Sequence, residues 1–168
     1  MIFTVGHSTR TAEEFLDVVR GVALVVDVRS YPGSRRNPQF GRDEMPRWTD
    51  AAGVGYVHAP LLGGRRRPTG SDANAAWRVE GFRAYADHMS TPEFAEGLAE
   101  LELLAADRDV AVMCSEALWW RCHRRLLADA LLARGWQVAH LPGRRHHVLP
   151  PIAVVDGVSV TYPGGTDA

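Results

Sequence analysis

The stretch VALVVDVR, residues 22–29, decides the fold, because every position before Asp27 is apolar. A strand with one face in water alternates apolar and polar residues, whereas an interior strand of a parallel sheet is apolar on both faces. The stretch therefore predicts an interior parallel strand over residues 23–28. Asp27 and Arg29 bring charge to the point where this strand ends.

Four further short apolar segments resemble this strand, and helical patterns separate them. They are residues 2–5, 54–58, 109–113 and 137–141. Helices are expected over residues 12–20, 42–52, 73–89, 91–105 and 121–135, the first with Thr11 and Glu14 spaced as a capping box. Strands that alternate with helices form crossover units around a parallel sheet. The sequence predicts a three-layer α/β fold: a mainly parallel five-stranded sheet with helices on both faces.

The extent of the chain indicates one α/β domain over residues 1–168, since 168 residues with 46% hydrophobic content can bury a full core. The segment PIAVVDGVSVTYP, residues 151–163, predicts a C-terminal β-hairpin over about residues 150–163, turning at Asp156 and Gly157. No apolar run is long enough to span a bilayer, so we expect a cytoplasmic protein without a membrane partner. Two cysteines make no disulfide framework and are expected to be reduced.

The loops after the predicted strands are rich in arginine. They comprise residues 6–12, 27–41, 58–70, 114–122 and 141–147. These loops hold ten of the 19 basic residues, all of which are arginines, and their only acids are Asp27 and Glu116. Ligands of parallel sheets bind where such loops converge. The net charge of the whole chain is −1, which argues against strong bulk attraction to nucleic acid. The edge of the sheet where these loops meet should nevertheless be basic. The ligand expected there is an anionic small molecule or nucleotide.

The segment MCSEALWWRCHRR, residues 113–125, contains both cysteines. Cys114 ends a core strand, where loop amides, a helix N-terminus and nearby arginines can stabilise a thiolate. The alternative is that Cys114 is a small buried hydrophobe. We expect Cys122 to be buried one turn into the last helix. His123 or His7 would act as the base, or either could be a histidine bonded within the core.

Several segments together resemble the family catalogued as domain of unknown function 488. They are TVGHSTR (4–10), VDVRSYPGSRRNPQF (26–40), YVHAPLLGG (56–64), MCSE (113–116) and CHRRLLADAL (122–131). The resemblance covers residues 2 to about 142 and leaves the hairpin outside. It implies no settled activity, although some members carry a DNA-repair label. It does imply that the Gly-His-Ser, Asp-Val-Arg, Cys-x-Glu and Cys-His-Arg segments belong together.

The order of strand, cysteine, loop and helix is also similar to that of rhodanese-type sulfurtransferases and cysteine phosphatases. Arg121 departs from the phosphatase pattern, because it follows Cys114 by seven positions and the phosphatase loop is shorter. Glu116, inside this loop, would repel an anion bound to the loop amides.

From these residues and the resemblance we predict one site at the edge of the sheet. The catalytic candidates are Cys114, Glu116, His123, His7 and Asp27. The anion-binding candidates are Arg29, Arg35, Arg36, Arg121, Arg124 and Ser8. Asp27 could orient a histidine, bind Arg29 or cap a turn, and Glu116 could act as an acid or base or form an ion pair.

Three classes of function follow. The favoured one is a cysteine-dependent transferase or hydrolase with a phosphate- or sulfur-containing substrate. The second is a nucleic-acid-binding accessory domain, with Trp119 and Trp120 stacking on bases and arginines on phosphates. The third is a metal-binding protein in which Cys114, Cys122 and His123 hold zinc, with Glu116 or His7 as a fourth ligand. No zinc-type spacing supports the third class, so no cofactor is predicted, and the oligomeric state is left open.

Overall fold

The apolar segments form a parallel sheet, as predicted. Its strands are β1 (Ile2–Gly6), β2 (Leu24–Asp27), β3 (Gly55–His58), β4 (Val110–Cys114) and β5 (Val138–His140). This computed structural model describes residues 1–164. The strand order is β3-β2-β4-β1-β5-β6, so the first strand lies in the interior between β4 and β5. The loops after β1, β2, β3 and β4 therefore leave the sheet at one edge, as the sequence predicted.

A sixth strand corrects the predicted number. β6 (Arg145–His146) pairs antiparallel with β5, inside the segment expected to be a loop. Both of its residues are exposed, so it has no apolar pattern that could mark it as a strand. The predicted C-terminal hairpin is confirmed as β7 (Val154–Asp156) and β8 (Ser159–Thr161), which form a separate two-stranded sheet.

Three helices lie within the predicted ranges. They are α1 (Ala12–Val18), α2 (Met45–Ala51) and α4 (Pro92–Ala105). The side chain of Thr11 accepts from the amide of Glu14, whose carboxylate accepts from the amide of Thr11, which confirms the capping box. Short 3-10 turns lie over Pro38–Phe40 and Pro60–Leu62.

Two helices begin later than predicted, because local polar contacts hold the preceding residues in turns. α3 spans Glu80–His88 instead of 73–89, since the side chain of Asn74 bonds to the carboxylate of Asp87 and to the amide of Tyr162. α5 spans Arg124–Ala133 instead of 121–135. A 3-10 turn over Trp119–Arg121 precedes it, and Cys122 and His123 lie outside the helix.

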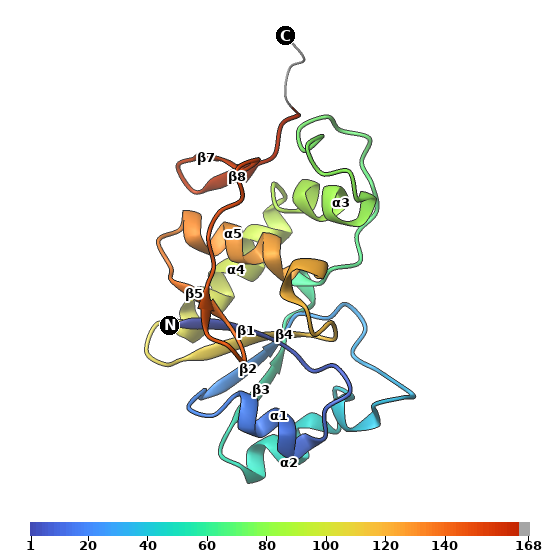
Figure 1. Ribbon diagram of the computed structural model, residues 1–168, viewed down its shortest axis with the longest axis vertical. Coiled ribbons are helices and arrows are strands. Elements are labelled where there is room, and N and C mark those ends of the chain that lie inside the picture. Colours follow the sequence, from blue (N-terminus) through green and yellow to red (C-terminus); the bar gives the residue numbers. More distant parts are fainter. Residues whose placement is uncertain (165–168) are drawn as a thin grey trace.

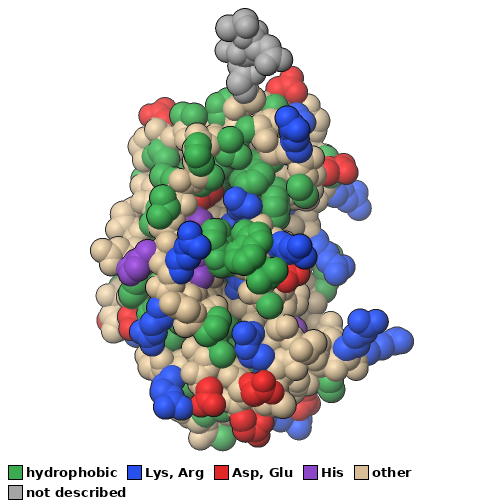
Figure 2. All heavy atoms as spheres, viewed as in Figure 1, with side chains coloured by type: hydrophobic (Ala, Val, Ile, Leu, Met, Phe, Trp, Pro, Cys, Tyr) green, Lys and Arg blue, Asp and Glu red, His purple; other side chains and the backbone are tan. Residues whose placement is uncertain are grey.

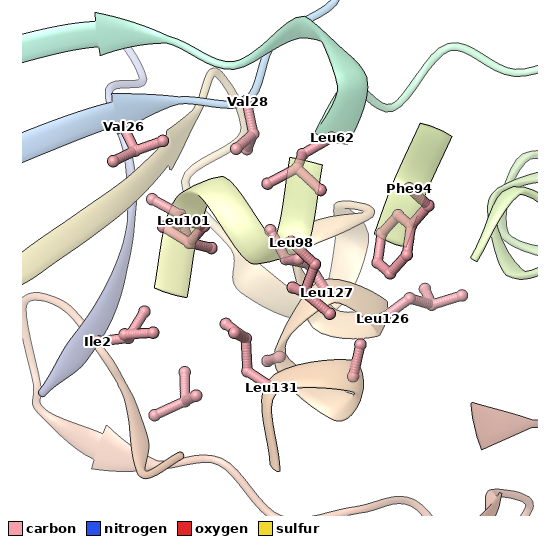
Figure 3. Packing of buried hydrophobic residues seen from close by; sticks show 14 of the residues in the cluster. Ile2, Val26, Val28, Leu62, Phe94, Leu98, Leu101, Leu126, Leu127 and Leu131 are labelled. Atoms are coloured by element: carbon pink, nitrogen blue, oxygen red, sulfur yellow. The ribbon is translucent and has the colours of Figure 1, made fainter. Parts of the chain in front are cut away.

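The helices cover both faces of the sheet and form three layers (Figure 1). α1 and α2 lie on one face, where Phe15, Phe40 and Met45 are fully buried. α4 and α5 lie on the other face, and their leucines pack against β1, β2 and the turn at Leu62 (Figure 3). The hairpin lies beyond α5 (Figure 1). No helix within residues 1–164 has the length and apolar character needed to cross a membrane.

A chain of buried hydrogen bonds joins the C-terminal segment to the central strands. The hydroxyl of Tyr162 and Nε2 of His147 each donate to the carboxylate of Asp129, both at 2.6 Å. Nε2 of His140 lies 3.0 Å from Nδ1 of His147, and Oγ1 of Thr4 lies 2.6 Å from Nδ1 of His140. Burial lowers the pKa of His140 to about 3, with help from the charge of His147. His140 is therefore neutral, and each of these buried polar side chains has a hydrogen-bond partner.

Candidate active site

The loops after β1 and β4 join directly at the edge of the sheet. The amide of His7 donates to the carbonyl of Cys114, and the amide of Ser8 donates to the carbonyl of Ser115, both at 2.9 Å. Gly6 permits this approach, because a Cβ there would lie 1.8 Å from the carbonyl oxygen of Glu116. Ser8 adopts a left-handed conformation with φ of 51°. The Gly-His-Ser and Cys-x-Glu segments are therefore in direct contact.

The two cysteines meet at this edge. Cys114 ends β4, and Cys122 lies two residues before α5, so the expectation that Cys122 sits within the helix is wrong. Their Sγ atoms are 2.7 Å apart. Both side chains are buried, with exposed fractions of 3% and 7%, and both are free thiols. Cys122 comes close to Cys114 because the chain forms a 3-10 turn over Trp119–Arg121 first. Cys122 therefore lies between this turn and the start of α5.

The two thiols differ sharply in acidity. The hydrogen bond between the two thiols lowers the pKa of Cys122 to about 4, and contacts with His123 and the amide of Arg124 act in the same direction. Burial raises the pKa of Cys114, and the neighbouring charge on Cys122 raises it further. Ionisation of one thiol opposes that of the other, and the contacts with Nδ1 of His123 and with the N-terminus of α5 favour the negative charge on Cys122.

His123 is positioned as the partner of Cys122. Its Nε2 donates to the carbonyl of Val28 at 3.1 Å, which leaves Nδ1 facing Sγ of Cys122 at 3.4 Å. The ring lies 4.9 Å from that of Tyr85. On another side it touches the loop after β3, where a Cβ on Gly64 would lie 2.3 Å from Nδ1.

Asp27 and Arg29 form a buried ion pair at the end of β2. The carboxylate of Asp27 is fully buried and accepts from Nε of Arg29 at 2.9 Å and from Nη2 at 2.7 Å. It also accepts from the amide of Arg29 and from the hydroxyl of Tyr56. Two of the alternatives for Asp27 are present here: it binds the side chain of Arg29, and it caps the turn by accepting from the amide two residues on. With its oxygens so engaged, Asp27 is not placed to move a proton.

His7 completes this arrangement. Its ring stacks on Phe40 with 4.3 Å between centroids, and its Nδ1 donates to the carbonyl of Ser8 at 2.8 Å. Its Nε2 lies 3.2 Å from Nη1 of Arg29 and must accept, because guanidinium nitrogens only donate. Burial lowers the pKa of His7 to about 4, and the charge of Arg29 contributes. His7 is therefore a neutral acceptor that orients Arg29.

Glu116 and Arg124 act through the main chain of the loop. Oε1 of Glu116 accepts from the amide of Leu118 at 3.2 Å, and its side chain is exposed. Nη2 of Arg124 donates to the carbonyls of Glu116 and Ala117 at 2.7 and 3.0 Å. Arg124 is only 1% exposed, and within residues 1–164 its Nε and Nη1 have no hydrogen-bond partner. It is a buried cation next to the thiols and not an open anion-binding group.

Two adjoining pockets open above these residues. The first, of about 350 Å³, is lined by Cys114, Cys122, His123, Glu116, Arg29, Arg65 and Arg121, among others. The second, of about 380 Å³, is lined by His7 and Ser8 and shares Arg29, Arg65 and Glu116 with the first. Pockets of this size suit small ligands. The structure thus brings most of the predicted site residues to one cleft.

Some predicted residues take other places. Arg35 and Arg36 are exposed on the loop after β2. Trp119 stacks on the ring of His140 with 4.1 Å between centroids, whereas Trp120 is 46% exposed. Sequence reasoning did not single out Arg65, which lines both pockets. Its position in the loop after the third strand was the available signal.

A metal site receives no support from this arrangement. Within residues 1–164, no three histidine, cysteine, aspartate or glutamate side chains are grouped so as to hold a metal ion. The zinc alternative through Cys114, Cys122 and His123 therefore rests on composition alone.

Comparison with known proteins gives one match. The model of a family described as "Domain of unknown function DUF488" matches residues 11–131. This range is narrower than the predicted one, and it includes both cysteines and His123 but not His7 or Ser8. No match was found among curated proteins or among solved structures.

Proposed function

The chain belongs to the DUF488 family, and because that description assigns no activity, we propose from the site itself that the protein is a cysteine-dependent enzyme. It transfers or hydrolyses an anionic group, phosphate- or sulfur-containing, that binds in the arginine-lined pocket. We place the nucleophile at Cys122 and not at Cys114, which the sequence favoured.

One observation carries this proposal: Cys122 faces Nδ1 of His123 and lines the same pocket as two exposed arginines. The pKa of Cys122 is about 4, and the lining includes Arg65 and Arg121. A buried cysteine with only a structural role needs no partner for its thiolate and no nearby cations. A thiolate beside an anion-binding surface is the arrangement that nucleophilic catalysis requires.

The proposed reaction uses His123 as the proton carrier. Cys122 reacts as the thiolate, with its proton held on Nδ1 of His123, while Nε2 keeps its own proton on the carbonyl of Val28. The thiolate then forms a bond to the phosphorus or sulfur centre of the substrate as the bond to the leaving group breaks, and water or a second acceptor afterwards takes the group from Cys122. Nδ1 returns the proton to the leaving group, and Arg65 and Arg121 hold the anion in place.

The test is the pH dependence of iodoacetamide labelling, with each cysteine followed by peptide mass spectrometry. Because only thiolates react, labelling of Cys122 in the native protein should rise with a midpoint near pH 4 and stay constant above about pH 6. An unperturbed thiol has its midpoint at about 8.5. Labelling of Cys122 at that ordinary midpoint, or only after unfolding, would remove the basis for nucleophilic catalysis.

A Gly64→Ala variant tests whether His123 sustains this acidity. The added Cβ would lie 2.3 Å from Nδ1 of His123, so the ring must leave its contact with Cys122. The labelling midpoint of Cys122 should therefore rise toward the ordinary thiol value. Gly143→Ala is the matched control, because a Cβ there has no neighbour within 4 Å among the described residues. An unchanged midpoint in a folded Gly64→Ala protein would mean that His123 does not hold the thiolate.

A second candidate function is nucleic-acid binding, favoured by the exposed Trp120 and by the arginines that border hydrophobic side chains on the face in Figure 2. Base stacking needs one open aromatic face, and Trp120 provides it while Trp119 is stacked on His140. Nucleic-acid binding becomes the favoured function, in place of the cysteine-dependent enzyme, if Cys122 labels as an ordinary thiol. Trp120→Ala would then weaken binding of single strands and leave labelling unchanged.

A further inference from the structure

The proposed reaction needs only one cysteine, yet a second cysteine lies in contact with it. Cys114 and Cys122 come from different elements, the end of β4 and the approach to α5, yet their Sγ atoms are 2.7 Å apart. Both residues line the first pocket. Neither thiol has a disulfide partner elsewhere, because the chain has only these two cysteines.

We propose that Cys114 and Cys122 form a reversible disulfide when a hydroperoxide enters the pocket, so that oxidation switches the site off and a dithiol restores it. The inference rests on the proposed function only in taking Cys122 as the first thiol to react. It assigns a role to Cys114, which the transfer reaction does not use.

The chemistry has two steps. The thiolate of Cys122 attacks one oxygen of the hydroperoxide, the O–O bond breaks, and Cys122 becomes a sulfenic acid while the other oxygen leaves as water or an alcohol after taking a proton. The sulfur of Cys114 then attacks the sulfenic sulfur. The S–S bond forms, the S–O bond breaks, and the hydroxide leaves as water with the proton of Cys114. Two thiols are oxidised and one peroxide bond is reduced.

Arg124 is placed to favour the second step. While Cys122 is a thiolate, its charge suppresses ionisation of Cys114, and the charge of Arg124 opposes that suppression. A neutral sulfenic acid at Cys122 removes the suppression and leaves the charge of Arg124 in place. Since Nε and Nη1 of this guanidinium have no partner within residues 1–164, its charge is free to stabilise a new thiolate on Cys114. The first oxidation thus prepares the second thiol.

The test is hydrogen peroxide treatment of the full chain in the presence of dimedone, which traps sulfenic acid. The wild-type protein should lose two hydrogens in its intact mass, show a cross-link between the peptides of Cys114 and Cys122, take up little dimedone, and revert with dithiothreitol. Cys114→Ser should accumulate the dimedone adduct on Cys122. In Cys122→Ser, oxidation of Cys114 should be slower by more than about tenfold, because little of an ordinary thiol is ionised near pH 7.

The Arg124→Met variant separates the two steps. It should trap dimedone on Cys122 although both thiols are present, whereas Arg125→Met, one residue along α5, should form the disulfide as the wild type does. The Cys114→Ser result does not depend on whether Arg124→Met folds.

Two outcomes overturn the inference: oxygen added to both sulfurs without a cross-link, or a dimedone adduct that appears first on Cys114. A low labelling midpoint at Cys122 without a cross-link would leave the proposed function standing and end this one. A cross-link in a protein whose Cys122 labels as an ordinary thiol would leave the disulfide inference standing and end the proposed function.

Discussion

Replacing Asp27 with alanine should lower the free energy of unfolding by about 3–5 kcal/mol, the cost of leaving a buried charge without its partner. Asp27 is fully buried and accepts from Nε, Nη2 and the amide of Arg29, whose side chain is 8% exposed. Alanine would remove these acceptors and leave the guanidinium in the core. Chemical denaturation followed by far-ultraviolet circular dichroism measures the loss.

Two controls sharpen this prediction. Asp17→Ala removes an exposed carboxylate that contacts Arg20 at 2.7 Å, and such a pair contributes no more than about 1 kcal/mol. The double variant Asp27→Ala, Arg29→Met should be more stable than Asp27→Ala alone, because the charge that lacks a partner is also removed. Equal losses for Asp27→Ala and Asp17→Ala would contradict the role of the buried pair.

Gly6→Ala should destabilise the protein by at least about 3 kcal/mol, the upper range for forcing extra volume into a packed interior. The Cβ would lie 1.8 Å from the carbonyl oxygen and 2.5 Å from the carbonyl carbon of Glu116, and neither is the end of a flexible side chain. The loop after β4 must shift, so the 2.9 Å bonds from the amides of His7 and Ser8 are strained as well.

The measurement for Gly6→Ala combines stability with the state of the thiols. Thermal unfolding should shift to a lower temperature, and in any folded fraction Cys114 should label faster with a neutral reagent, since the loop that follows Cys114 has moved. Gly143→Ala provides the control, because its Cβ meets nothing within 4 Å among the described residues. Identical unfolding temperatures for the two variants would show that the loops do not join at Gly6.

The sequence was sufficient for the sheet because the sheet depends on a local pattern. Continuous apolar runs such as residues 22–26 and 110–113 mark interior strands, and each predicted strand lies within two residues of the observed one. The loops that follow them had to converge, so Cys114, His7 and Arg29 could be placed at one edge without coordinates.

The arrangement inside the site was not predictable, because it depends on where one turn ends. A helical period alone extends α5 back to Arg121, whereas the 3-10 turn over Trp119–Arg121 places Cys122 ahead of the helix and against Cys114. Likewise, the sequence allowed several partners for Asp27, and only the packed structure selects Arg29. β6 escaped prediction because its two residues are polar and exposed.

The interior position of β1 has a consequence for how the chain folds. Ile2 pairs with Val110 on one side and with Val138 on the other. β1, the first strand in the chain, therefore completes its pairing only when β4 and β5 have formed. Closing so long a loop costs chain entropy that only the completed contacts offset, and such non-local pairing makes folding slow. We therefore expect Cys114, at the end of β4, to be brought beneath the loop after β1 only late in folding. We expect both sulfurs to be more open to solvent until then, so that the protein is oxidised more readily while it folds than once it is native.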